Sequence, residues 1–381
     1  MDTAPSERVL SIQSHVVYGY VGGKAAVFPL QCLGYDVDVV NTVHFSNHAG
    51  YGRSGGTKAS AAELNAVFES MEFNELLAPT RLLTGYIPGA EGLSAVAGLA
   101  RKLKKEKPEL IYLLDPVMGD AGRLYVAADV IPIYREMLPL ATIIAPNWFE
   151  VETLTQVKLA DLPSLRKALS ILHDTYHVPN VVITSIPLTP WLRGALPASI
   201  QPPSDEEHLL CLASSRVSSD ASPQVHAQCV PLIPGYFSGV GDLFSALLLA
   251  HFRPSHPSTS TPAADIAAAS LPSPITPPPT SESSAPPPVS QTQSQTPVAR
   301  AAAHALATTH HILSLTHAHA VTLPAEQRVP TDDEADAKEP LRKTRRMRGR
   351  ELRLVQGQAA IRGEGVLVRD MRGWEEFWSE L

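Results

Sequence analysis

The sequence predicts an α/β fold with a mostly parallel central sheet and helices on both of its faces. Short apolar runs of strand length recur along the chain, and stretches with the spacing of an amphipathic helix lie between them. Strands that alternate with helices are joined by crossovers, which build a parallel sheet covered on both sides. The chain has 381 residues, of which 44% are hydrophobic, and this suffices for the large core that such a fold needs.

The expected strands end in polar residues or glycine. The strand segments are 8–13, 36–45, 81–86, 110–117, 141–147 and 180–185. Their last positions include Gln13, Ser14, Thr84, Gly85, Asp115, Asn147, Thr184 and Ser185. Ligands of open parallel sheets bind outside the carboxyl ends of the strands. These residues are therefore the first candidates for a site.

The remaining elements follow from periodicity or from its absence. Apolar periodicity predicts helices over 59–73, 93–108, 164–177 and 298–320. Residues 186–222 mix proline, serine and acidic residues without clear periodicity, so an exposed loop is expected there. The run RELRLVQ at 350–356 predicts a final strand.

Low-complexity sequence interrupts the last third of the chain. The 34 prolines are unevenly placed, and segment 253–297 is so rich in proline, serine and threonine that apolar burial cannot offset its ordering entropy. We expect residues 1–252 plus 298–381 to form a single domain. In this reading 253–297 is an inserted disordered loop, and 324–350 is a polar, basic surface loop.

Charge and cysteine content exclude several classes of protein. The net charge of −7 gives no basic field for nucleic acid. The N-terminus lacks the basic region of a signal peptide and a span long enough for a membrane. Cys32, Cys211 and Cys229 form no CxxC pair, which favours a reducing compartment. We therefore expect a cytoplasmic protein with neither nucleic-acid nor membrane partners.

The stretch GVGD places Asp242 at the start of an apolar helical run. Glycines before a helix let a phosphate approach the free N–H groups of its first turn, so Gly239 and Gly241 favour an anion site. Asp242 then has two interpretations: an acid that stabilises the helix start, or a base that takes a proton from an attacking hydroxyl. A competing phosphate loop, GYVGGKAA, fails the Walker A pattern at Tyr18 and at Ala25.

Three further features have simple structural explanations. His310 and His317 share a helix face while His311 and His319 drift away from it, so a helix surface is favoured over a metal site. The basic run 341–353 suits a solvated loop, with nuclear import or an acidic partner as the alternative. The proline tract could bind SH3-type domains, but an entropic spacer is the simpler interpretation.

Taken in order, these segments resemble the pyridoxal kinases of the ribokinase-like superfamily. The resemblance is carried by residues 8–52, 82–89, 113–126, 143–155, 181–185 and 239–250, and it resumes at 309–316 and 351–356. SIQSHV followed by GYVG, together with FSNHAGYG, is specific to vitamin B6 kinases, whereas GVGD marks only the superfamily. The resemblance implies a ribokinase-like three-layer sandwich that phosphorylates the 5′-hydroxyl of pyridoxal, pyridoxine or pyridoxamine with ATP. It also implies a homodimer.

The resemblance assigns roles to the candidate residues. Asp242 would be the base, and the amides at Gly239, Val240 and Gly241 would form the anion hole. The B6 ring would contact Ser14, Val21, Phe45, Ala49 and Tyr86. From the residues alone, core packing explains Val21 and Phe45, a cap or turn explains Ser14, and an exposed aromatic near a turn explains Tyr86.

The nucleotide and cation sites also come from the resemblance. ATP would contact Asp115, Asn147, Glu150, Thr184, Ser185, Gly239 and Val240. Mg²⁺ and a monovalent cation, K⁺ or Na⁺, would be held by Asp115, Asp120, Glu150 and Thr184. Hard oxygen ligands suit Mg²⁺ bridged to phosphates, although helix capping explains an Asn-x-x-Glu pattern equally well.

Three positions depart from the family pattern. Ala49 replaces a threonine that reaches the B6 ring, so weaker vitamer binding is expected. Ala145 replaces a threonine near the monovalent ion, so a looser cation site is expected. Val240 replaces the threonine of Gly-Thr-Gly-Asp, which leaves the backbone donors in place. Two alternatives stay open: a hydroxymethylpyrimidine kinase of thiamine synthesis, and a catalytically silent B6-binding protein.

Overall fold

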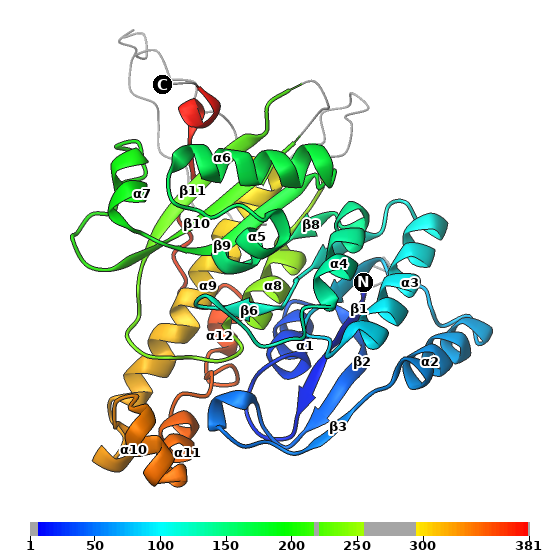
Figure 1. Cartoon of the computed structure of the whole chain (residues 1–381), viewed down its shortest axis with the longest axis horizontal. Coiled ribbons are helices and arrows are strands. Elements are labelled where there is room, and N and C mark those ends of the chain that lie inside the picture. The colour runs from blue at the N-terminus through cyan, green and yellow to red at the C-terminus, as the bar shows by residue number, and fades with distance from the viewer. Residues whose placement is uncertain (1–6, 217–220, 255–294, 380–381) are drawn as a thin grey trace, which may run out of the picture. The chain divides into compact units, whose positions relative to one another are not determined.

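The computed structural model describes residues 7–216, 221–254 and 295–379, and Figure 1 shows their arrangement. The main sheet has ten strands in the order β12-β11-β10-β9-β8-β5-β4-β1-β2-β3. A separate hairpin is formed by β6 and β7. The strands are β1 (Arg8–Val16), β2 (Asp36–Phe45), β3 (Gly56–Lys58), β4 (Arg81–Thr84), β5 (Ile111–Leu114), β6 (Gly119–Asp120), β7 (Arg123–Leu124), β8 (Ile143–Ile144), β9 (Asn180–Pro187), β10 (His208–Ser215), β11 (Gln224–Pro231) and β12 (Arg372–Gly373).

The centre of the sheet is parallel and its edges are antiparallel. Strands β9, β8, β5, β4, β1 and β2 pair in parallel with their neighbours. Strand β3 is antiparallel to β2, and β10, β11 and β12 extend the other edge in antiparallel pairs. The predicted fold class, a mostly parallel sheet in a three-layer sandwich, is thereby confirmed.

Helices cover both faces of this sheet (Figure 1). Buried residues of α2 to α6 join one apolar cluster, and those of α1, α8 and α9 join a second. The helices are α1 (Gly23–Cys32), α2 (Ala61–Phe73), α3 (Ala90–Glu106), α4 (Val130–Met137), α5 (Trp148–Thr155), α6 (Leu162–Ser170), α7 (Pro190–Ala195), α8 (Val240–His251), α9 (Pro297–Ala320), α10 (Asp333–Lys338), α11 (Pro340–Arg348) and α12 (Gln358–Ile361).

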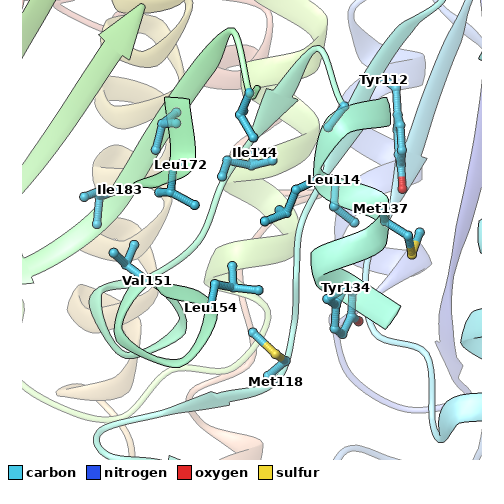
Figure 2. Packing of buried hydrophobic residues seen from close by; sticks show 14 of the residues in the cluster. Tyr112, Leu114, Met118, Tyr134, Met137, Ile144, Val151, Leu154, Leu172 and Ile183 are labelled. Atoms are coloured by element: carbon cyan, nitrogen blue, oxygen red, sulfur yellow. The ribbon is translucent and has the colours of Figure 1, made fainter. Parts of the chain in front are cut away.

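The first cluster supports the loops that follow the central strands. Leu114 and Ile144, each the last residue of its strand, pack with Met118, Val151 and Leu154 beneath those loops, as Figure 2 shows. These five side chains are at most 1% exposed. The residues that follow Leu114 and Ile144 therefore start from a rigid base.

A buried arginine closes the other end of α8. The Arg81 guanidinium donates hydrogen bonds to the carbonyl oxygens of Leu249 (2.8 Å) and Phe252 (3.1 Å), and to the Glu7 carboxylate (3.0 Å). Cationic donors at a helix C-terminus satisfy carbonyls that have no partner within the helix. Contacts with Arg81 therefore satisfy the C-terminal end of α8 before residue 255.

Three sequence predictions were wrong. Within 186–222, expected to be a loop, the chain forms α7 and the buried strand β10. Segment 324–350 was expected to be a surface loop, but it contains α10 and α11 and buries Arg346 against Asp336. No strand forms at 350–356; Leu352 and Leu354 alternate into the core without pairing to a sheet edge.

The predicted insertion cannot be assessed in the same way. Residues 255–294, which make up most of the predicted loop 253–297, lie outside the described residues, so that interpretation and the single-domain assignment stay predictions. Among the helices of the described residues, none is both long and apolar enough to cross a membrane.

Candidate active site

The parallel strands bring most of the predicted site residues to one edge of the sheet. Leu114 of β5 pairs with Thr84 of β4 and with Ile144 of β8, so these strands end level with one another. Asp115 follows β5 and Asn147 caps the helix after β8. Ser14 lies near the end of β1, and Thr184 lies within β9, beyond the pair of Ile144 with Val181 that ends its parallel pairing with β8.

Helix α8 places Asp242 over this edge. Gly239 is the N-cap of α8 with φ of 80°, and a Cβ there would lie 2.0 Å from the Tyr20 carbonyl oxygen, so only glycine fits. Asp242 Oδ2 accepts a hydrogen bond of 2.8 Å from the Gly22 N–H. In the amide orientation that matches donors to acceptors, Gln13 donates to Asp242 Oδ1 at 3.3 Å. Burial raises the pKa of Asp242, and the Gly22 hydrogen bond offsets part of that effect.

Asp115 lies beside Asp242, and the two carboxylates repel each other. The Ser245 hydroxyl of α8 donates to Asp115 Oδ2 at 2.8 Å. Burial, followed by the charge of Asp242, raises the pKa of Asp115 to about 7. A Cβ on Gly241 would lie 3.9 Å from Asp115 Oδ2, which puts this carboxylate at the exposed helix start. A ligand at the start of α8 would therefore meet both acids.

Glu150 is buried and forms a capping box with Asn147 at the start of α5. Its Oε2 accepts from the Asn147 N–H (2.9 Å), and its own N–H donates to Asn147 Oδ1 (3.0 Å). Glu150 Oε1 accepts from the Met118 N–H at 2.9 Å. Burial and the charge of Asp115 raise the pKa of Glu150 well above its usual value. The capping interpretation of Asn-x-x-Glu thus describes the local structure, and the Glu150 carboxyl lies close enough to Asp115 for the charge of Asp115 to raise its pKa.

Asp120 stands apart from the buried acids. It lies exposed in the β6–β7 hairpin, where its carboxylate accepts a hydrogen bond from the Ala121 N–H at 2.7 Å. Tyr125, just after this hairpin, was not singled out from the sequence. Its side chain is 56% exposed, but burial of the hydroxyl and the charges of Glu150, Asp115, Asp120 and Asp242 raise its pKa. Tyr125 therefore borders the acidic region.

Two of the residues predicted to bind the B6 ring, Ser14 and Val21, lie beside Gly22 and Gly239, next to Asp242. Ser14 is buried, and a Cβ on Gly22 would come within 2.2 Å of its Oγ, so the 19–22 loop rests on the end of β1. Val21, Phe45 and Tyr86 are half-buried, and Ala49 is exposed at the start of the short 3-10 helix Ala49–Tyr51. The Tyr86 carbonyl accepts from the Thr42 hydroxyl at 2.8 Å, which fixes the backbone at that wall.

The remaining predicted residues occupy different environments. Thr184 and Ser185 are half-buried in β9, and the Thr184 N–H donates to the Pro146 carbonyl at 3.0 Å. Val240 packs partly against the second apolar cluster, and Ala145 is buried within it. In the described part of the chain, no three His, Cys, Asp or Glu residues are grouped so that they could hold a metal ion by themselves.

Several residues near the site were given no role from the sequence. Gln13 and Ser245 contact the two acids, and Glu351 contacts the loops at 19–22 and 48–51. Gln13 was noted only as a strand end. Glu351 is at least 300 residues from its partners, so no local spacing could indicate the contact.

A parallel sheet whose carboxyl edge carries an aspartate at a glycine-rich helix start is the architecture of the ribokinase-like kinases, and this chain is a kinase of that class. It is 41% identical over 265 residues to the pyridoxal kinase of Arabidopsis thaliana, which covers 69% of this chain and 80% of that protein. The pyridoxal kinase of Homo sapiens is 38% identical over 259 residues, which covers 65% and 79% of the two chains. The chain belongs to the pyridoxal kinase family.

Solved structures agree with this assignment. A pyridoxal kinase from Leishmania donovani in complex with ADP and pyridoxamine superposes with a TM-score of 0.68 at 28% identity, over 97% of this chain and 99% of that chain. A pyridoxal kinase from Trypanosoma brucei gives 0.66 at 27% identity, over 97% and 100%. A family model described as phosphomethylpyrimidine kinase matches residues 53–192, a stretch that includes neither Ser14 nor Asp242. The resemblance drawn from the sequence is confirmed.

Proposed function

We propose that this protein transfers the γ-phosphoryl group of ATP to the 5′-hydroxyl of pyridoxal, pyridoxine or pyridoxamine. The observation that carries the proposal is the position of Asp242, on a helix start where an anion can bind and beside the predicted ring pocket. Relatives named pyridoxal kinase, and Leishmania structures with ADP and pyridoxine or pyridoxamine, support the same substrates.

Asp242 acts as the general base. Gly22 and Gln13 orient its two oxygens, and its raised pKa makes it a better proton acceptor than an exposed aspartate. It takes the proton of the 5′-hydroxyl as that oxygen attacks the γ-phosphorus and the bond to the leaving ADP oxygen breaks.

The start of α8 stabilises the transferring phosphoryl group. The first-turn N–H groups, at Val240 and Gly241 in particular, have no acceptor within the helix and carry the positive end of its dipole. Gly241 is exposed, so nothing obstructs approach to these donors. These backbone N–H groups, together with the N–H of Gly239, form the anion hole. Because the donors belong to the backbone, the valine at position 240 leaves the anion hole intact.

The buried acids suit a divalent cation. Both carboxyls are buried, the charge of Asp242 raises the pKa of Asp115, and the charge of Asp115 raises the pKa of Glu150; a cation would relieve this repulsion. Mg²⁺ commonly binds one or two carboxylates plus substrate phosphates and water, so a larger protein ligand set is not required. Asp115 would hold it directly, Glu150 through water, with Asp120 and Thr184 nearby. Bound Mg²⁺ would neutralise charge on the phosphates.

The other side chains bind and orient the two substrates. Ser14 hydrogen-bonds the pyridine ring, Val21, Phe45 and Tyr86 form its walls, and Ala49 lies at its edge. Asn147, Thr184 and Ser185 bind the nucleotide, and Thr184 also contacts a monovalent cation, K⁺ or Na⁺. We further propose a cytoplasmic homodimer, which sedimentation velocity and cell fractionation would test.

The decisive experiment is ATP-dependent formation of pyridoxal 5′-phosphate by the purified protein and by Asp242→Asn and Asp242→Ala. Both variants should lose at least about 100-fold in kcat, because general-base catalysis contributes that much or more. Circular dichroism spectra matching the wild type would show that they fold. Turnover by the wild type that persists in both variants would refute the base, and pyridoxal binding without turnover would favour a silent B6-binding protein.

The match to a phosphomethylpyrimidine kinase model favours a second candidate substrate, hydroxymethylpyrimidine. A panel of pyridoxal, pyridoxine, pyridoxamine and hydroxymethylpyrimidine would separate the two. We expect the highest kcat/KM for a B6 vitamer, because the relatives that this chain resembles over most of its length are named pyridoxal kinases.

A further inference from the structure

Glu351 is a buried carboxylate that joins two loops from the opposite end of the sequence. Its side chain is 12% exposed and lies outside any helix or strand. It accepts hydrogen bonds from the Tyr20 N–H (2.8 Å), the Tyr51 hydroxyl (2.6 Å) and His48 Nε2 (3.0 Å). Three hydrogen bonds to one charged carboxylate are stronger than three hydrogen bonds between neutral groups would be.

The first loop connects Glu351 to the proposed base. Tyr20 donates its N–H to Glu351, while its carbonyl oxygen lies against Gly239 so closely that no Cβ could fit there. Two residues later, the Gly22 N–H holds Asp242 Oδ2 at 2.8 Å. A displacement of Tyr20 would therefore move both the start of α8 and the donor to Asp242.

The second loop connects Glu351 to the ring pocket. His48 Nδ1 accepts from the Gly50 N–H at 3.1 Å, so the proton of the neutral ring is on Nε2, where it is donated to Glu351. The Tyr51 hydroxyl fixes the other end of the same short 3-10 helix. This helix carries Ala49, so the carboxylate determines where the pocket edge lies.

Charge on Glu351 is maintained by these donors. Burial alone would raise the pKa of Glu351, but the hydrogen bonds from His48, Tyr51 and Tyr20 lower it below the usual value. Burial and the neighbouring carboxylate raise the pKa of Tyr51, so the phenol keeps the proton that it donates.

We infer that Glu351 is a positioning residue that aligns Asp242 and the vitamin-binding loop by holding Tyr20, His48 and Tyr51. The inference rests on the proposed function. It assigns no contact between Glu351 and either substrate.

The test is steady-state kinetics of Glu351→Gln, which keeps the size of the side chain but removes its charge and one acceptor oxygen. We expect kcat/KM for pyridoxal to fall about 10- to 100-fold, as for loss of hydrogen bonds to a charged group. The KM for ATP should change less than the KM for pyridoxal, because Glu351 contacts neither Asp115 nor Asn147 and reaches the start of α8 only through Tyr20. Tyr51→Phe removes one donor and should have a smaller effect of the same kind. The effects of the two changes should be less than additive when combined.

Asp336→Asn is the matched control. Asp336 accepts from Arg342 and Arg346 in the same part of the chain and holds α10 to α11, so this variant should lower Tm without changing vitamer kinetics. Unchanged vitamer kcat/KM in Glu351→Gln would overturn the inference, and so would equal kinetic losses in both variants at equal Tm. If Glu351→Gln does not fold, the kinetics of Tyr51→Phe test the inference instead. Wild-type kinetics of Tyr51→Phe would also overturn the positioning role of Glu351. Absence of turnover in the wild type would instead refute the proposed function.

Discussion

Asp115 combines burial with a neighbouring negative charge, and this combination has a cost in stability. Its carboxyl lies at the end of β5, is 6% exposed and faces Asp242. Catalytic acids are often held in such unfavourable surroundings, because the ligand supplies the missing compensation.

We predict that Asp115→Asn stabilises the free protein above neutral pH. The pKa of Asp115 is about 7 in the folded state and about 4 when unfolded, so the folded state binds the extra proton between these values. Its contribution to stability is complete below about pH 4 and is lost as the pH rises to about 7. Urea denaturation across this range should show the advantage of the variant over the wild type growing with pH, while kinase activity falls. A difference in the free energy of unfolding between variant and wild type that does not change with pH would contradict the raised pKa of Asp115 in the folded state.

Ala49 allows a gain-of-function test. A threonine there would restore the hydroxyl that the family uses at the B6 ring, and a hydrogen bond is worth about 0.5–1.5 kcal/mol. We expect Ala49→Thr to lower the KM for pyridoxal about 2- to 10-fold with the KM for ATP unchanged. Steady-state kinetics measures both, and an unchanged vitamer KM would show that position 49 does not reach the ring.

At the scale of single elements, the start of α8 depends on a glycine. Gly239 has φ of 80° and lies against the Tyr20 backbone. Gly98, in the exposed face of α3, has an ordinary φ and nothing within 4 Å of an added Cβ.

We predict opposite outcomes for the same substitution at these two glycines. Gly239→Ala should cost at least about 1–2 kcal/mol from left-handed backbone strain and should abolish turnover, because the helix start must move. Gly98→Ala should stabilise by about 0.5–1 kcal/mol and leave turnover unchanged. Chemical denaturation and kinetics measure both. A fully active Gly239→Ala would show that the close packing on Tyr20 is not needed.

The sequence patterns predicted helices and strands well where the apolar periodicity reflects burial, either of a strand within the sheet or of a helix packed on the sheet. Segments 36–45 and 298–320 match β2 and α9 within one residue. Segment 350–356 misled because Leu352 and Leu354 alternate into the core although the segment pairs with no strand among the described residues. Residues 333–348 were misread because their helices depend on the Asp336–Arg346 ion pair, which composition cannot reveal.

The candidate site was predictable to the extent that strand ends define it. Asp115, Asn147 and Thr184 could be found because they follow apolar runs, and parallel strands bring such positions together. Gln13 was a strand-end candidate without a role. Glu351 and Ser245 could not be found, since they act through tertiary contacts that leave no local pattern.

At the scale of the whole molecule, the proline-rich tract interrupts the chain between two helices that pack together. The C-terminal end of α8 and the start of α9 share the second apolar cluster, and His251 stacks on His304 at 4.7 Å. Arg81 satisfies the last carbonyls of α8. The described contacts therefore hold this junction together without residues 255–294.

We predict that replacing residues 255–294 with a Gly/Ser linker of about ten residues leaves kcat and both KM values unchanged. Because composition predicts disorder in this tract, shortening it about fourfold should stabilise the protein by about 1 kcal/mol. Thermal unfolding and kinetics of the shortened protein test this. A folded but inactive product would show that the tract takes part in the reaction.

The contact of Glu351 with Tyr20, His48 and Tyr51 also affects how the protein matures during its synthesis. The loops at 19–22 and 48–51 leave the ribosome at least 300 residues before the carboxylate that holds them. At about 5–20 residues per second, roughly 15–60 s separate the two events. During that time the loops at 19–22 and 48–51 of the nascent chain lack the carboxylate that holds them, so the proposed active site is completed only after residue 351 has been made.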